Sequence, residues 1–84
     1  MPAILELADD ETRKIAVWEK GMAIANYDPA VWRCDARGQV IKFADHGNRN
    51  SKYGWEIDHH PVPPILRVGD HFADFRPLHC ARRA

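Results

Sequence analysis

Apolar and polar residues follow two different periods along this chain. Between residues 9 and 22, Ile15, Trp18 and Met22 recur at intervals of three and four, which places them on one face of a helix. We expect this helix to begin at an aspartate cap, residue 9 or 10, and to end near residue 20, where a glycine follows. Its apolar stripe should pack on the core.

The later segments have the period of two that is typical of strands. Residues 31–43, VWRCDARGQVIKF, place β-forming residues on both sides of a polar turn at residues 35–38, and this arrangement predicts a hairpin. A long polar loop follows, and residues 54–60, GWEIDHH, predict a further strand that ends before Pro61. A short terminal helix is expected after Pro77, with basic residues at its end.

The strand at residues 54–60 ends in an acid and two histidines, which a buried strand does not require. Side chains alternate in a regular strand, so Trp55, Ile57 and His59 should share one face, whereas Asp58 faces the opposite way. Asp58 and His59 could therefore act in one site only if the strand ends or bulges beside them. The following Pro61 makes an ending plausible.

Length and composition indicate a single folded domain. The chain has 84 residues, of which 45% are hydrophobic and 29% charged, as in ordinary globular proteins. We expect residues 1–28 to form a helical scaffold and residues 29–84 to carry the site. No apolar run approaches the roughly 20 residues of a membrane-spanning helix, and the start lacks a basic leader. These features exclude a membrane-spanning protein and predict a cytoplasmic location.

The number of cysteines and the distribution of charge limit the possible metal sites and partners. Cys34 and Cys80 are too few for a disulfide framework and match no zinc spacing, so both are expected to be reduced and partly buried. The overall charge is zero, but residues 1–28 hold six acids against three bases, a net −3. Residues 29–84 hold nine bases against six acids, a net +3, with all five histidines. An anionic partner would meet this second part.

Several phrases of the chain together resemble a known family. They are AVWEKG, DPAVWR, a D-x-x-G turn, HGNRNSKYGWEIDH, and D-x-x-x-x-F-R-P-L, and they cover about residues 12–78. The combination is similar to small bacterial endonucleases of the HNH family, in which GWEIDH is the specific phrase. The resemblance implies an α+β fold, a compact ββα-metal domain with an additional N-terminal helix. In such a domain a divalent ion lies between a hairpin and a helix.

The resemblance also implies roles for individual residues. The position of His59 is that of the general base, Asp58 aligns with a metal ligand, and Asp74 takes the catalytic middle position. Hydrolysis of a phosphodiester needs a base that activates water and a hard cation that neutralises charge. Mg²⁺ or Mn²⁺ is the expected ion, with Zn²⁺ or Ni²⁺ as alternatives, and no further cofactor is implied. The expected partner is DNA, with RNA as an alternative, held by the side chains of Asn48, Arg49, Lys52 and Arg76.

Two positions depart from the family pattern. The middle residue is usually Asn, whereas Asp74 can only accept hydrogen bonds when ionised. The last metal ligand, usually His or Asn, aligns with Arg83, and an arginine cannot ligate a cation. His79 lies four residues earlier and could substitute from the same face of a helix, one turn away. That substitution would move the ion by about 5 Å.

Three hypotheses follow. The first is a divalent-metal-dependent nuclease that hydrolyses DNA, with His79 or Asp74 completing the site. The second is a degenerate domain that binds nucleic acid or a larger protein partner without catalysis. The third is a zinc module built from histidines and Cys80, for which the spacings do not supply four ligands. Trp18, Trp32 and Trp55 are expected in the core rather than as stacking platforms for bases.

Overall fold

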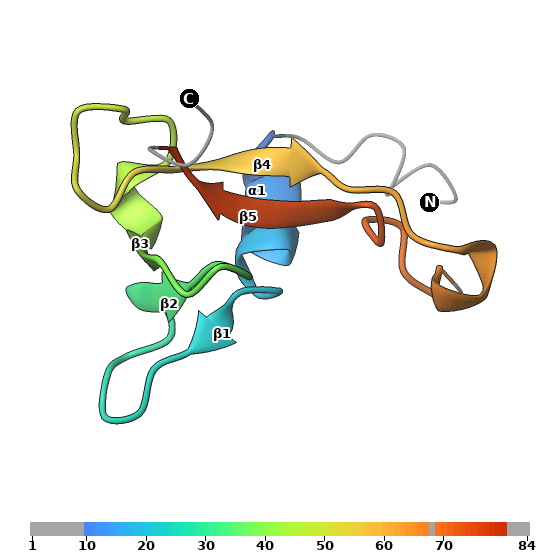
Figure 1. The fold of residues 1–84 in the computed structure, drawn as a ribbon, viewed down its shortest axis with the longest axis horizontal. Helices are drawn as coiled ribbons and strands as arrows, with labels where there is room; N and C mark the ends of the chain where they lie inside the picture. The colour runs from blue at the N-terminus through green and yellow to red at the C-terminus, as the bar shows by residue number, and fades with distance from the viewer. Residues whose placement is uncertain (1–9, 68, 81–84) are drawn as a thin grey trace.

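The fold was analysed in a computed structural model, which describes residues 10–67 and 69–80 (Figure 1). It is α+β: in this part of the chain, one helix packs with two antiparallel sheets. The elements in order are α1 (Asp10–Trp18), β1 (Met22–Ala23), β2 (Trp32–Cys34), β3 (Val40–Lys42), the 3-10 turn η1 (Phe43–Asp45), β4 (Trp55–His59), the 3-10 turn η2 (Pro64–Leu66) and β5 (Phe75–His79). None of the described helices is long and apolar enough to cross a membrane.

Helix α1 lies where the pattern predicts it, but its buried face differs. Val17 and Trp18 are buried, whereas Ile15 is 42% and Met22 52% exposed. The prediction that all three stripe residues pack on the core is therefore wrong for Ile15 and Met22. For Met22 the physical reason is that the helix ends at Trp18, after only nine residues. Met22 has already left it and belongs to β1, at the edge of a sheet.

The first sheet has the order β1-β2-β3, and all its strands are antiparallel. The expected hairpin is β2–β3, in which Arg33 pairs with Ile41 across the turn. The pattern gave no sign of β1, because two residues are too few to display a period. The Arg33 guanidinium helps to hold this short strand, since it donates to the carbonyl oxygens of Gly21 at 2.8 Å and Glu19 at 3.2 Å.

The second sheet consists of β4 and β5, which pair antiparallel from Trp55↔His79 to His59↔Phe75. The helix predicted after Pro77 is therefore wrong for residues 77–79, and residues 81–84 lie outside the described part of the chain. Pro77 is compatible with this strand because of the register. The Cys80 N–H donates to the Gly54 oxygen at 2.9 Å, so the alternating ladder makes Ile57↔Pro77 a non-hydrogen-bonded pair. A missing N–H costs nothing there.

The core lies between α1 and the two sheets. Its buried members are Val17, Trp18, Ile41 and Trp55, and Phe43 packs against them. The Trp18 ring lies 5.2 Å from Trp55 and 5.4 Å, edge to face, from Phe43. Figure 1 shows α1 crossing behind the β4–β5 pair, and α1 contacts β5. Trp18 and Trp55 are thus core residues, as expected.

The cysteines match the expectation from their number and spacing. Both are free thiols; Cys80 is buried beside Gly54 and Cys34 is half-buried in β2.

A buried carboxylate joins the two sheets. Asp35, in the β2–β3 turn, is fully buried, and its Oδ1 accepts the N–H groups of Arg37 and Gln39, each at 2.9 Å. Its Oδ2 accepts the His79 N–H at 2.9 Å, from the end of β5. One side chain therefore closes the hairpin turn and fixes the last strand against it, and its charge is compensated by three backbone donors.

We predict that Asp35→Ala lowers the free energy of unfolding by about 3 kcal/mol, because it removes charged hydrogen bonds and leaves buried N–H groups without an acceptor. Urea unfolding followed by circular dichroism measures this change. Asp28→Ala is the matched control, because Asp28 is exposed and its Oδ1 accepts one N–H, that of Ala30. It should cost less than about 1 kcal/mol. Equal losses in the two variants would contradict the assigned role of Asp35.

Candidate functional site

The Asp58-His59 pair lies at the end of β4. His59 is exposed, and its ring lies 5.3 Å from that of Phe75, its partner across the ladder. Asp58 is partly buried, and its Oδ2 accepts a hydrogen bond from Arg76 Nε at 3.2 Å. The ladder continues without a bulge through both residues. Their side chains therefore extend toward opposite faces of the strand.

The face of β4 that carries Asp58 also carries Glu56, and both acids are paired with arginines. Arg49 Nη2 lies 3.0 Å from Glu56 Oε2, and Arg76 Nε lies 3.2 Å from Asp58 Oδ2. The two arginines that the resemblance assigns to a nucleic-acid backbone are thus gathered along one strand. Arg49 is mostly exposed, and such a surface ion pair is worth only about 0–1 kcal/mol in water, whereas both side chains of the Arg76–Asp58 pair are largely covered.

Asp74 holds the start of the connection between β4 and β5. Its Oδ1 accepts the Val62 N–H at 2.9 Å and lies 3.4 Å from Arg67 Nε, and its carbonyl oxygen accepts the His60 N–H at 2.5 Å. The side chain therefore fixes the backbone that follows His59. This bond requires only an acceptor, so an aspartate makes it as well as the asparagine that is usual in the family.

The structure does not bring His79 to Asp58. His79 pairs with Trp55, at the opposite end of the ladder from His59, and it is buried. Its Nε2 hydrogen-bonds the carbonyl oxygen of Lys52. A carbonyl only accepts, so Nε2 carries the proton in this bond. The prediction that His79 could replace the missing last metal ligand assumed that it lies on a helix, whereas His79 lies in β5.

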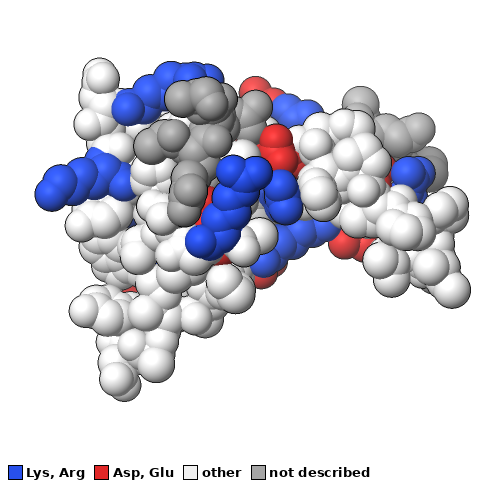
Figure 2. Space-filling model, in the orientation of Figure 1, with Lys and Arg blue, Asp and Glu red and all other residues white. Residues whose placement is uncertain are grey.

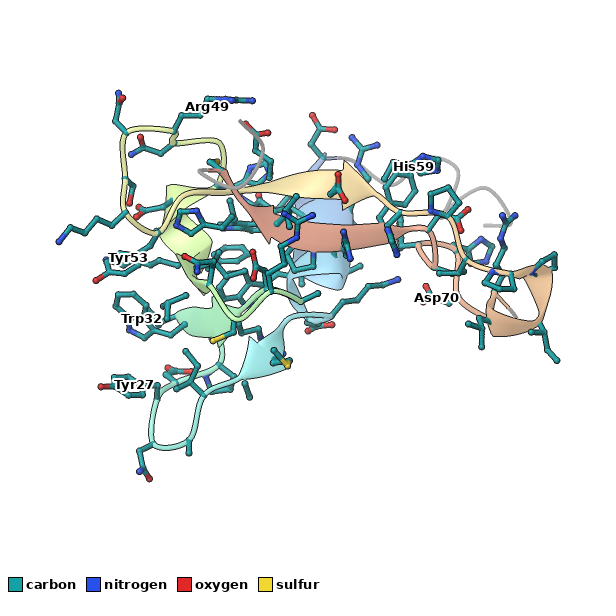
Figure 3. All side chains as sticks on the ribbon, viewed as in Figure 1. Tyr27, Trp32, Arg49, Tyr53, His59 and Asp70 are labelled. Carbon is teal, nitrogen blue, oxygen red and sulfur yellow. The ribbon has the colours of Figure 1, made fainter. Side chains whose placement is uncertain are left out.

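The loop at residues 46–54 presents the other expected contacts. Asn48 Oδ1 accepts the Asn50 N–H at 3.0 Å, so this side chain stabilises the loop. Gly54 passes so close that a Cβ there would lie 1.9 Å from the Asn48 carbonyl oxygen. The closure of the loop therefore requires glycine at this position. Lys52 is exposed on the loop, and Figure 3 shows Arg49 extending outward from it.

The metal ligands that the resemblance implies are not gathered among the described residues. Within residues 10–67 and 69–80, no three His, Cys, Asp or Glu side chains converge as metal ligands. Asp58 offers a hard oxygen donor, but its Oδ2 is bonded to Arg76. The aligned last position, Arg83, lies outside the described residues, and its side chain has no donor atom for a cation.

An aromatic hollow, lined by residues that were not assigned to the site, opens on another part of the surface. It has a volume of about 390 Å³ and is lined by Ile24, Tyr27, Trp32, Val40 and Tyr53. Trp32 is half-buried at the wall of this hollow. It does not belong to the buried core cluster, so the prediction that Trp32 is a core residue is wrong. The three aromatic residues are distant in sequence, and only the fold brings them together.

His46 packs against the core at the base of the loop. Its ring lies 4.6 Å from that of Trp55, edge to face. Burial lowers the pKa of His46 below its ordinary value of 6.5, and the positive charge of Lys14 lowers it further. Glu56, Glu11 and Asp10 oppose this shift with smaller effects. His46 is an exposed residue whose imidazole is therefore harder to protonate than a free one.

Comparison with protein-family models, with curated proteins and with solved structures found no match for this chain.

We predict that His46 makes stability fall with acid. Because its pKa is lower in the folded state, the unfolded chain binds more protons below about pH 6.5. The stabilising contribution is present above that pH and is lost as the pH falls toward the lowered pKa. Urea unfolding between pH 7.5 and about 5 should show a smaller decline for His46→Gln than for wild type.

His71→Gln is the control, because His71 is exposed, and it should keep the wild-type slope. The same decline in His46→Gln and wild type would contradict the role of His46. The pKa of Asp70 is lowered from 3.8, mainly by its hydrogen bond from Lys20. Asp70 therefore changes stability only at a pH below the range of this experiment.

Proposed function

We propose that this chain is an HNH-like module that binds the sugar-phosphate backbone of nucleic acid and has lost efficient hydrolysis. The observation that carries the proposal is the ion pair between Asp58 and Arg76. It joins the aligned metal ligand to an expected phosphate contact, so the positive partner of this acid is an arginine side chain. The phrase GWEIDH supports the family resemblance, and the charges around it support binding.

The arrangement of the two motif strands is compatible with the two-stranded part of a ββα-metal fold. β4 carries GWEIDH and β5 carries FRPLH, and the two pair antiparallel over their whole length. In the family a helix would follow the second strand, and here the corresponding residues 81–84 lie outside the described part. Asp74 fixes the chain beside His59 as an orienting residue would.

Binding is favoured over cutting because the chemistry of cutting is incomplete. A positioned general base such as His59 contributes about 10²- to 10⁴-fold, whereas enzymes accelerate their reactions by about 10⁶-fold or more. The remainder would have to come from a cation that stabilises the developing charge. The described residues do not gather ligands for one, and Arg83 cannot replace the last ligand.

Phosphates can compete for the arginines of the β4 face. The Arg49 side chain is mostly exposed, so a phosphate can replace Glu56 at little cost. Arg76 is more covered beside Asp58, and it would add a contact at the edge of the same strand pair. Lys52 adds a further positive charge on the same loop as Arg49. Figure 2 shows lysine and arginine side chains across the upper and central part of the face that carries the second sheet, with acidic groups between them. Such a mixed surface predicts moderate, salt-sensitive binding.

The second candidate is a nuclease of low activity. It is favoured by one feature, the exposure of His59 next to Asp58 at a strand end. A water molecule could reach this imidazole without any rearrangement of the chain.

Binding to a short DNA duplex at several salt concentrations tests the main proposal. Phosphate contacts by Arg49, Lys52 and Arg76 predict a slope of log K against log salt of about −3. Lys52→Ala should weaken binding and reduce the slope by about one. Fluorescence anisotropy with a labelled duplex measures both quantities.

Arg13→Ala is the matched control for this experiment. Arg13 is an exposed cation of α1 that pairs with Asp10 at 2.7 Å, away from the loop and β4. Its removal should leave the slope unchanged. Equal effects of the two substitutions, or binding that does not depend on salt, would refute the interface.

A plasmid assay separates the two candidates. With supercoiled DNA and Mg²⁺ or Mn²⁺, the wild-type protein should nick no faster than His59→Ala, and EDTA should change neither rate. Nicking that is lost both in His59→Ala and with EDTA would instead establish the nuclease and end the proposal of a binding module. Equal, EDTA-sensitive nicking by both proteins would indicate a contaminating enzyme.

A further inference from the structure

The aromatic hollow is an exposed apolar surface that the β4 face does not use. Tyr27 is 60% and Tyr53 36% exposed, although an aromatic side chain is normally well covered in the folded state. The Trp32 ring meets that of Tyr53 edge to face at 5.0 Å. Figure 3 shows the three labelled rings one above another along one edge of the molecule. The volume of about 390 Å³ is within the range of small-ligand sites, roughly 300–1,000 Å³.

The charges beside the hollow are positive. Lys42 Nζ lies over the Trp32 ring, 5.4 Å from its centroid, and Lys52 directly precedes Tyr53 in the loop. No acidic residue lines the hollow in the described part of the chain. The nearby acid Asp28 follows Tyr27, and its Oδ1 accepts the Ala30 N–H. A ligand with flat rings and negative charges would match both the lining and the rim.

We propose that the aromatic hollow binds unpaired bases of single-stranded nucleic acid, with the neighbouring phosphates at Lys42 and Lys52. This inference rests on the proposed function and deepens it, because it names the form of nucleic acid. Bases stack on exposed aromatic rings whatever their sequence. A duplex keeps its bases stacked on one another, so it reaches the cations without filling the hollow.

The proposed phosphate interface and the hollow share the loop at residues 46–54, which carries both Lys52 and Tyr53. Lys52 and Tyr53 are adjacent, and the Lys42 N–H donates to the Tyr53 carbonyl oxygen at 3.0 Å, which joins β3 to the end of the loop. A strand that contacts Lys52 can therefore place its next bases on Tyr53 and Trp32. A proline-rich peptide would also suit aromatic rings, but it has no negative charge to match the two lysines.

Three fluorescent probes of equal length test the inference with the full chain: a single-stranded thymidine oligonucleotide, an abasic oligonucleotide with the same phosphates, and a duplex. Wild-type protein should bind the thymidine strand about tenfold more tightly than the abasic strand, as one or two stacked bases allow. Tyr27→Ala should remove most of this difference and leave abasic and duplex binding unchanged. Tyr53→Ala should act in the same direction.

Leu66→Ala is the matched control, because Leu66 is an apolar side chain that is 64% exposed in η2, outside the hollow. Circular dichroism confirms that each variant is folded. The inference is overturned if the thymidine and abasic strands bind equally, or if Tyr27→Ala and Leu66→Ala behave alike. Salt-sensitive duplex binding in that case leaves the proposed function intact, whereas no binding to any of the three probes overturns both. Tyr27-dependent binding of a proline-rich peptide with no thymidine preference would assign the hollow to a peptide instead.

Discussion

The acceptance of three backbone N–H groups by the Asp35 carboxylate is the interaction on which the arrangement of this small protein depends. Neither sheet is large: one has three short strands and the other has two. An isolated two-stranded sheet is marginal in water, so β4 and β5 need external support. α1 and the core tryptophans supply apolar contacts to the second sheet, while Asp35 supplies a directional bond to the backbone of β5. The carboxylate thereby fixes the position of the site strands relative to the rest of the fold.

The same interaction determines what His79 can do. Its backbone is held by Asp35 and its imidazole by the Lys52 carbonyl oxygen, so this residue ties β5 to the loop that carries Arg49 and Lys52. Asp74 has a comparable task at the other end of the ladder, where it holds the Val62 N–H. The two residues that the nuclease hypothesis considered as alternatives to complete the site thus both hold backbone groups in place. A structural use of both fits a domain that presents cations and rings to a polyanion.

The proposed interface combines weakly held charge with exposed aromatic surface. Arg49, in an exposed ion pair, can exchange its partner at little cost, which suits contacts with a phosphate backbone that need not recognise sequence. The aromatic hollow lies beside Lys42 and Lys52 and would add stacking, which depends on unpaired bases and not on their identity. Both contributions are non-specific in sequence. The proposed interface would therefore distinguish single-stranded from duplex nucleic acid and not one base sequence from another.

The sequence by itself determined the positions of α1, the β2–β3 hairpin and β4, because each has a local signal: apolar residues at helical spacing, a polar turn between β-formers, or an alternating strand closed by prolines. It did not determine which face of α1 is buried. It also identified Asp58 and His59 as neighbours on opposite faces of β4. Only the tertiary structure decided that residues 75–79 form β5, since pairing with β4 overrides the helical start that a proline favours. Tertiary contacts likewise placed Met22 at an exposed sheet edge, put His79 far from Asp58, and gathered Tyr27, Trp32 and Tyr53. These outcomes depend on strand register and long-range packing, which cannot be read from the spacing of apolar residues in the sequence.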